Sequence, residues 1–204
     1  MDEAATITNG AIRARLDADG RVRFERSVDR RLLLVEQDPH FVDPRARHFG
    51  HRPDGYWRVE AAFSAHEGER LYGLGQQQHG RLDQKGCVVD LVQRNTQVAV
   101  PFVLSSRGYG FLWHDPAVGR VELARNGTRW IAEASRGMDY WITAAETPAS
   151  ILERYSEATG RAPMLPERAA GFWQSNLRYR SQAEVLSVAN EYRRRGLPLD
   201  VIAI

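Results

Sequence analysis

Cysteine is nearly absent from the 204-residue sequence, in which Cys87 is the only example. A single cysteine excludes an internal disulfide framework and is typical of proteins from a reducing compartment, so we expect a cytoplasmic location. Cys87 lies in the strand-like stretch CVVDLVQ, which favours a buried, inert thiol over a nucleophile.

Long apolar runs are also missing. No stretch approaches the roughly 20 apolar residues that a helix needs to cross a bilayer. The N-terminal sequence MDEAATITNG is acidic and lacks the basic and apolar regions of a signal peptide. We therefore expect no membrane partner.

An excess of one charge is missing as well. The formal net charge is +2, and the densest basic run, residues 193–195, lies where we expect a helix to end. Because arginine at that end complements the helix dipole, a solvated helix face explains the run better than nucleic-acid contact. The sequence predicts no nucleic-acid partner.

The stretch YGLGQQQHG contains Gly73, Gly75 and His79. A phosphate loop would open a helix directly behind its glycines, whereas the polar sequence RLDQKG follows here, so we expect a loop at the end of a strand. His79 has no second histidine or thiol at metal-ligand spacing. The sequence predicts no metal ion and no other cofactor.

Residues 1 to about 145 have the pattern of an all-β domain, with short alternating or apolar runs between turn residues at the spacing of a β-sandwich. Asn126-Gly127 predicts a type I′ turn with positive φ at both positions. Aromatic residues between 109 and 141 lie mostly at strand spacing, which indicates core packing. We expect a strand over residues 138–143 and hairpins that join 11–17 to 21–26, 99–106 to 109–115, and 120–125 to 129–134.

The pattern becomes helical after residue 146. Thr147 and Pro148 predict an N-cap followed by proline at the first helical position, and Gly160 ends this helix. Its apolar face consists of Ile151, Leu152, Tyr155 and Ala158. The proline-punctuated sequence RAPMLPE, residues 161–167, then predicts a domain boundary.

A strand–helix–strand pattern follows this boundary. Ser181 and Glu184 have the spacing of a capping box, Gly196 ends the second helix, and the helix's apolar face is Val185, Leu186, Ala189 and Tyr192. The final run LDVIAI is typical of a strand buried on both faces, so we expect parallel pairing in a βαβ unit. A unit of under about 40 residues rarely folds alone. The sequence therefore predicts a complete β-domain over residues 1–160 and the opening of a larger α/β domain over 161–204.

Five aspartates are candidates, by residue type alone, for the paired carboxylates of sugar chemistry. They are Asp83, Asp90, Asp115, Asp139 and Asp200. Asp200 lies at the entry of its strand, whereas reactive groups of parallel α/β folds follow the carboxyl ends of strands. A structural aspartate explains this position better.

The sequence PMLPERAAGFWQSNLRYRSQAEVLSVANEYRRRGLPLDVIAI resembles the junction between the N-terminal β-sandwich and the catalytic barrel of glycoside hydrolase family 31, the α-glucosidase and α-xylosidase family. YGLGQ, PFVLSSRGYGFLW and the segment from YWIT to TPASILERYSEATG also look like its N-terminal domain, so the resemblance spans most of the chain from about residue 69. It implies a mainly β fold: a galactose-mutarotase-like β-sandwich followed by the truncated start of a (β/α)8 TIM barrel.

The resemblance also implies a function. In this family one aspartate attacks the anomeric carbon and a second protonates the leaving oxygen, with retention of configuration. Both belong to barrel strands beyond residue 204, so we expect no catalytic residue in this chain. The chain would be the N-terminal portion of an enzyme that hydrolyses terminal α-xylosides or α-glucosides, inactive without the missing C-terminal barrel. Homo-oligomerisation of the full-length enzyme stays open.

Four residues match positions that contact substrate in the family. Arg94 and Asn95, in QRNT, correspond to a sandwich loop that reaches the sugar, and many relatives have aspartate where this chain has Asn95. An amide can still pair with a sugar hydroxyl. Asn176 and Leu177 follow the first barrel strand, and some relatives have tyrosine in place of Leu177. Ordinary loop structure explains these residues equally well.

Two other functions stay open at this point. The chain could be a free-standing carbohydrate-binding β-sandwich whose C-terminal segment is a remnant without catalysis. It could also be a structural or interaction fragment. Sugar binding by the isolated chain distinguishes the first of these from a half-site that depends on a barrel.

Overall fold

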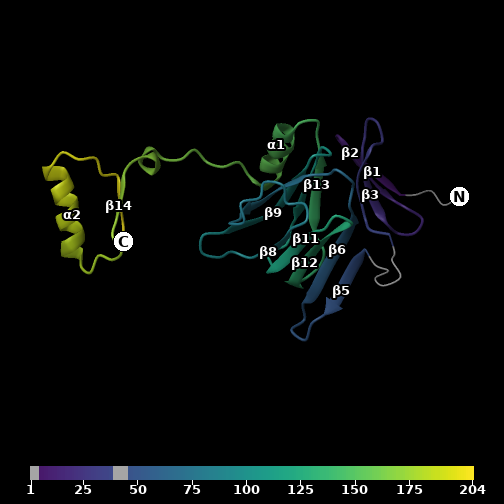
Figure 1. The fold of residues 1–204 in the computed structure, drawn as a ribbon, viewed down its shortest axis with the longest axis horizontal. Helices are drawn as coiled ribbons and strands as arrows, with labels where there is room; N and C mark the ends of the chain where they lie inside the picture. The colour runs from purple at the N-terminus through teal and green to yellow at the C-terminus, as the bar shows by residue number, and fades with distance from the viewer. Residues whose placement is uncertain (1–4, 39–45) are drawn as a thin grey trace. The chain divides into compact units, whose positions relative to one another are not determined.

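The computed structural model describes residues 5–38 and 46–204 (Figure 1). It divides into two compact units, Met1–Thr159 and Gly160–Ile204, which are called unit 1 and unit 2 below and are each described separately. Among the described residues, no helix is long and apolar enough to cross a membrane.

Unit 1 is built from three sheets, and all strand pairs within them are antiparallel. The first sheet has the order β1-β2-β3-β4, with strands Thr6–Asn9, Ile12–Leu16, Val22–Arg26 and Leu32–Val35. The second has the order β13-β10-β9-β7, with strands Tyr140–Ala144, Tyr109–Trp113, Val98–Ser105 and Leu71–Gln76. The third has the order β5-β6-β12-β11-β8, with strands Arg47–His51, Trp57–Ser64, Gly127–Ser135, Gly119–Leu123 and Val88–Leu91.

The core of unit 1 lies between these sheets. In β6, the alternate residues Val59, Ala61 and Phe63 are buried, which is the period-2 pattern of a strand with one face on a core. All five residues of β10 are buried, because β10 is central in its sheet and helix α1 (Pro148–Thr159) packs against it.

The aromatic residues of this region fill the core, as the sequence predicts. Phe111, Trp113 and Trp130 are buried, and Trp113 stacks on Trp130 with ring centroids 6.3 Å apart. Phe111 stacks on Tyr140 at 5.2 Å. Such pairs add to the free energy that their burial contributes, so packing accounts for these rings without a ligand.

Helix α1 begins as predicted, because the N–H of Ser150 donates to Thr147 Oγ1 over 3.2 Å in an N-cap bond. Ile151 is buried, and Tyr155 stacks on Phe102 with centroids 4.2 Å apart. The predicted apolar face is too wide, since Leu152 is 48% exposed. The helix buries one narrow stripe against β10 rather than a broad face.

The three predicted hairpins are confirmed by the pairing of β2 with β3, β9 with β10, and β11 with β12. The predicted type I′ turn is wrong, since neither Asn126 nor Gly127 has a positive φ. The register pairs Leu123 with Thr128, so the connection has four residues rather than two. Gly127 already pairs with Ser64 of β6, and the neighbouring strand rather than the local turn sets its conformation.

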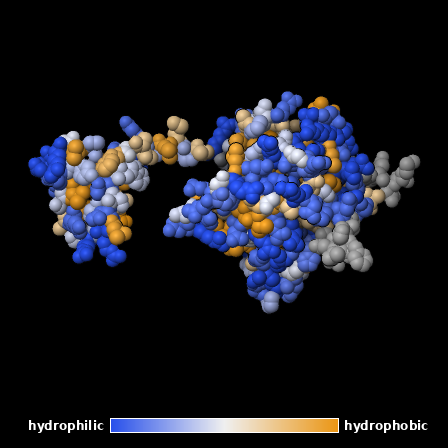
Figure 2. Space-filling model, viewed as in Figure 1, coloured by the Kyte–Doolittle hydropathy of each residue, from blue (hydrophilic) through white to orange (hydrophobic). Residues whose placement is uncertain are grey.

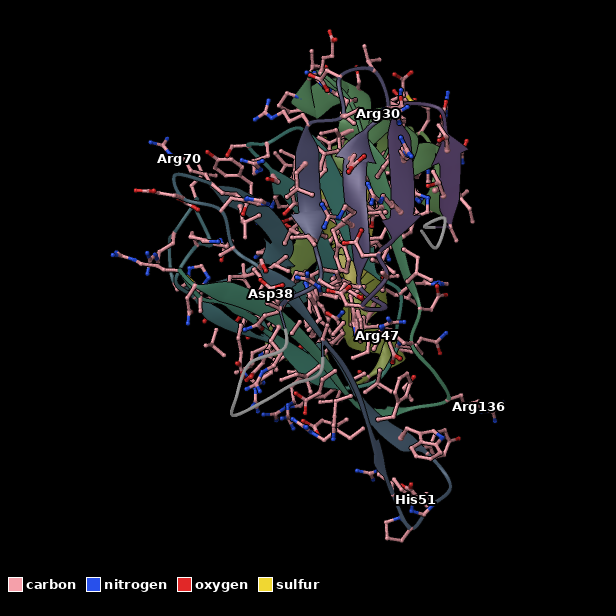
Figure 3. All side chains as sticks on the ribbon, turned by 90° about the vertical axis from the view of Figure 1, so that its right-hand side faces the viewer. Arg30, Asp38, Arg47, His51, Arg70 and Arg136 are labelled. Atoms are coloured by element: carbon pink, nitrogen blue, oxygen red, sulfur yellow. The ribbon has the colours of Figure 1, made fainter. Side chains whose placement is uncertain are left out.

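The first and third sheets are joined by a buried carboxylate. Glu36 is 1% exposed; its Oε2 accepts from the N–H of Val22 at 2.8 Å, and Arg47 Nε lies 3.1 Å from its Oε1. Burial outweighs these contacts and raises the pKa of Glu36. Arg47 begins β5, and the β5–β6 hairpin extends from there to His51 at its far end (Figure 3).

Unit 2 contains a short 3-10 helix η1 (Glu167–Ala170), strand β14 (Trp173–Ser175), helix α2 (Gln182–Arg194) and strand β15 (Val201–Ala203). β14 and β15 pair in parallel, with Trp173 opposite Val201 and Ser175 opposite Ala203. The predicted βαβ unit is therefore confirmed.

Helix α2 has the predicted cap with one difference. The N–H of Glu184 donates to Ser181 Oγ over 3.2 Å, but the carboxylate of Glu184 accepts from the N–H of Arg180 rather than from Ser181. Gly196 has a φ of 64°, as expected beyond a helix end. Leu186 of the predicted apolar face is exposed, so the helix covers the strands with fewer apolar residues than predicted.

The final strand is shorter than the run LDVIAI predicts, and it is only partly buried in this chain. Strand structure covers only Val201–Ala203; these residues are half-buried, and Ile204 is 95% exposed. In the described residues β14 is the only strand that pairs with β15, so one edge of the strand lacks a neighbour. Several hydrophobic residues lie on the visible surface of unit 2 (Figure 2).

Candidate functional site

A tight turn at residues 94–97 connects β8 to β9 and forms the first candidate site. The N–H of Gln97 donates to the carbonyl of Arg94 over 3.1 Å, which closes a four-residue turn. Thr96 has a φ of 69°, the left-handed value that a type II turn requires at its third position. The turn places Asn95 at an exposed corner.

The base of this turn is held by a glutamine that acts as a strand partner. The Nε2 of Gln93 donates to the carbonyl of Ala99 (2.8 Å), and the N–H of Ala99 donates to Gln93 Oε1 (3.0 Å). Two bonds from one carboxamide replace a pair of ladder bonds. The turn therefore rises from a fixed base at the start of β9.

Arg94 and Asn95, the two predicted contacts in this turn, differ in their availability. Arg94 donates to Asp90 Oδ2 over 2.7 Å, and both side chains are about half exposed. A surface ion pair of this kind contributes only about 0–1 kcal/mol, but it directs the guanidinium back toward β8. Among the described residues, the carboxamide of Asn95 has no hydrogen-bond partner. Asn95 is thus the residue of the pair that is free to bind a ligand.

The glycines of YGLGQQQHG lie inside β7 rather than in a loop after it, which corrects the predicted placement. The pairing of β7 with β9 shifts register between Gly73 and Gly75, and both glycines have positive φ. A Cβ on Gly75 would lie 2.0 Å from the carbonyl oxygen of Val98. The glycines therefore permit close approach of two strands, and no helix N-terminus for a phosphate follows them.

The loop after β7 contacts the turn at residues 94–97. The Nε2 of Gln78 donates to Thr96 Oγ1 over 2.5 Å, and the Oγ1 of Thr96 donates in turn to the carbonyl of Asn95. Sequence reasoning missed Gln78, because no motif marks a contact that depends on the bulge in β7. His79 of the same loop accepts from the N–H of Arg81 through Nδ1 (3.1 Å). Within the described part of the chain, no group of three potential metal-binding side chains occurs.

A buried polar cluster fixes the two ends of this loop. Glu69, 6% exposed, accepts through Oε1 from Ser105 Oγ (2.6 Å) and from the hydroxyl of Tyr109 (2.8 Å). The Nζ of Lys85 lies 3.6 Å from Glu69 Oε2. Burial, followed by the charge of Glu69, raises the pKa of Tyr109 well above its usual range. The cluster joins the beginning of β7, the far end of the loop and strands β9 and β10, which is a structural role.

The remaining candidate side chains also have local partners. Cys87 is half-buried against the core of unit 1, immediately before β8. The N–H of Phe172 donates to Asp200 Oδ2 over 2.9 Å, so the structural interpretation of Asp200 agrees with its contacts. Asp83, Asp115 and Asp139 bond to the N–H of Leu71, the N–H of Ala117 and the ring of His114, respectively.

The second candidate pair lies in unit 2, directly after β14. Asn176 Oδ1 accepts from the N–H of Leu177 over 2.8 Å, and the Leu177 side chain is 96% exposed. Both residues line an open hollow together with Arg178, Arg180 and Glu184. They follow the carboxyl end of a parallel strand, which is where α/β folds place binding groups. The ligand contacts of the four residues Arg94, Asn95, Asn176 and Leu177 stay a prediction.

Comparison with known proteins identifies the family. Residues 2–122 match the Glycosyl hydrolase 31 N-terminal galactose mutarotase-like domain, and residues 162–204 match the Glycosyl hydrolases family 31 TIM-barrel domain. The chain belongs to glycoside hydrolase family 31. The mainly β fold, followed by the beginning of a barrel, is confirmed by these matches.

Three known proteins illustrate the similarity. An uncharacterized family 31 glucosidase from Pseudescherichia vulneris is 40% identical over 99% of this chain and 41% of its own length. An α-xylosidase from Saccharolobus solfataricus is 41% identical over 72% of this chain and 22% of its own length. The crystal structure of an α-xylosidase from a soil metagenome, complexed with xylose, has a TM-score of 0.87 and 44% identity, covering 99% of this chain and 32% of that protein. The chain therefore spans between about a fifth and two fifths of the length of these relatives.

Proposed function

We propose that this chain forms the N-terminal part of a retaining α-glycoside hydrolase that cleaves terminal α-xylosides or α-glucosides. The observation that carries the proposal is the likeness to the xylose-bound α-xylosidase, which is 44% identical over 99% of the chain with a TM-score of 0.87. In this proposal residues 1–160 are the sandwich domain and residues 161–204 supply the first strand, helix and second strand of the barrel. A cytoplasmic location and a homo-oligomeric full-length enzyme are further expectations of the same proposal.

Retaining hydrolysis needs a nucleophilic carboxylate and an acid/base carboxylate about 5 Å apart. The local bonds of Asp83, Asp90, Asp115, Asp139 and Asp200 explain these five residues without catalysis. In our proposal the chain's own residues therefore bind and orient the sugar, while the two carboxylates come from the rest of the barrel.

Asn95 is the residue that we propose to contact the sugar from unit 1. Its carboxamide can both donate to and accept from a hydroxyl group, and it is exposed on a turn with a fixed base. Arg94 would lie beside Asn95 at the sugar, with its guanidinium paired to the carboxylate of Asp90. From unit 2, Asn176 and Leu177 would line the mouth of the barrel at the carboxyl end of its first strand.

The experiment that tests this proposal measures the release of p-nitrophenol from p-nitrophenyl α-xyloside and α-glucoside. We expect none from purified residues 1–204, and turnover from a protein in which the same residues are joined to a complete family 31 barrel. Turnover by the 204-residue chain alone would refute the proposal that the catalytic carboxylates lie elsewhere. No turnover on either substrate by the joined protein would refute the proposed substrate class.

A further inference from the structure

The turn at residues 94–97 depends on a threonine in an unusual conformation. Thr96 has a φ of 69°, and β-branched residues rarely occupy this left-handed region. Such backbone conformations persist only where surrounding contacts hold them. Thr96 receives one such contact from the side chain of Gln78, which lies on the separate loop after β7.

Gln78, Thr96 and Asn95 form a directed chain of hydrogen bonds. The side-chain amide of Gln78 donates to the hydroxyl of Thr96, and this hydroxyl donates to the carbonyl of Asn95. The donor–acceptor distance is 2.5 Å in each bond. Consecutive bonds of this kind polarise one another. The second of these hydrogen bonds ends on the carbonyl of Asn95. It therefore restrains the peptide plane between Asn95 and Thr96, and with it the direction in which the Asn95 side chain points.

The loop that carries Gln78 is itself anchored at both ends. The Nε2 of Gln77 donates to the carbonyl of Leu74 over 2.9 Å. Beyond Gln78, the N–H of Gln84 donates to the carbonyl of Leu71 over 2.7 Å. Gln78 therefore approaches the turn from a fixed frame.

We propose that Gln78 is a positioning residue for the sugar contact of Asn95. It does not touch the sugar; it holds Thr96 in the left-handed conformation, so that the carboxamide of Asn95 is presented in one orientation before substrate binds. This inference rests on the proposed function, because Asn95 is the group that contacts the sugar there. The Gln78–Thr96 bond is exposed, so its effect on orientation exceeds its effect on global stability.

A double-mutant cycle tests the positioning role. In the protein that joins residues 1–204 to a complete barrel, Gln78→Ala should lower kcat/KM for p-nitrophenyl α-xyloside by about three- to tenfold, the range expected for one neutral hydrogen bond. In a Thr96→Gly background, Gln78→Ala should have no further effect, since the hydroxyl that it holds is gone and glycine adopts positive φ freely. Ser27→Ala is the matched control: it removes an exposed neutral side-chain hydrogen bond, from Ser27 Oγ to the carbonyl of Gly10, outside the loop and the turn, and should leave kcat/KM unchanged.

A second measurement uses the 204-residue chain itself and does not depend on turnover. Gln78→Ala should accelerate amide exchange at Gln97, whose N–H closes the turn, by about three- to tenfold, while Ser27→Ala leaves that amide unchanged. Unchanged exchange at Gln97 in Gln78→Ala would overturn the inference. So would an unchanged kcat/KM in Gln78→Ala when Asn95→Ala lowers it. If Asn95→Ala itself has no effect on kcat/KM, Asn95 does not contact the sugar and this inference fails with it. The proposed hydrolase function does not fail with that result, because the release of p-nitrophenol by the joined protein tests it separately.

Discussion

Gly75 gives the sharpest prediction about the frame of the candidate site. It has a φ of 83°, and a Cβ added there would lie 2.0 Å from the carbonyl oxygen of Val98 and 2.8 Å from the nitrogen of Val100. An alanine in the left-handed region costs about 1–2 kcal/mol. Displacing the backbone of β9 adds about 1–3 kcal/mol, as for other overpacked sites. Gly75→Ala should therefore lower the free energy of unfolding by about 2–5 kcal/mol.

Gly80 is the matched control, because it has a φ of 69° but no atom within 4 Å of the added Cβ. Gly80→Ala should cost only the conformational part, about 1–2 kcal/mol. Thermal unfolding of the 204-residue chain, followed by circular dichroism, should show a fall in Tm of about 4–20 °C for Gly75→Ala and about 2–8 °C for Gly80→Ala, with Gly75→Ala the lower in direct comparison. Equal losses in the two variants would refute the explanation that the glycine permits close approach of β7 and β9.

Two further predictions concern buried titratable groups. Burial, followed by the charge of Glu36, raises the pKa of Tyr140 to about 12, whereas an unfolded tyrosine loses its proton near pH 10. The folded state retains this proton to a higher pH than the unfolded state does, so the free energy of unfolding should fall by about 2–3 kcal/mol from pH 10 to 12. In urea titrations, Tyr140→Phe should lack this part of the loss; identical pH profiles for the two proteins would contradict the assignment of the loss to Tyr140. Glu69→Ala leaves Lys85 and two hydroxyls without their acceptor and should lower the free energy of unfolding, measured in urea, by about 3–5 kcal/mol. Glu67→Ala, at a neighbouring exposed position, should change it by no more than about 0.5 kcal/mol; similar values for the two variants would show that the cluster contributes little.

Much of the fold could be predicted from local sequence signals. Turn residues between runs of period two identify hairpins, and Thr147-Pro148 identifies the start of a helix, because in these places the chain's own backbone preferences decide the structure. The predictions that failed depend on neighbours. Gly127 adopts an extended conformation because it pairs with β6, and Leu152 is exposed because the sheet beneath α1 covers only a narrow stripe.

The candidate site could be predicted only in part. The resemblance to family 31 indicates Asn95 as a candidate sugar contact, but the contact of Gln78 with Thr96 joins residues 18 positions apart across a bulged strand. No local sequence pattern predicts a contact between residues so far apart in the sequence. The positive φ of Thr96 likewise cannot be read from the sequence, since it occurs in a turn that is closed by the bond between Gln97 and Arg94.

Isothermal titration of xylose into purified residues 1–204 tests the central claim most directly. If the turn at residues 94–97 is half of a sugar site that the rest of a barrel completes, the isolated chain should give no binding heat, and the protein joined to a complete barrel should bind xylose. Stoichiometric binding to the 204-residue chain, abolished by Asn95→Ala, would contradict the account and identify a free-standing sugar-binding module.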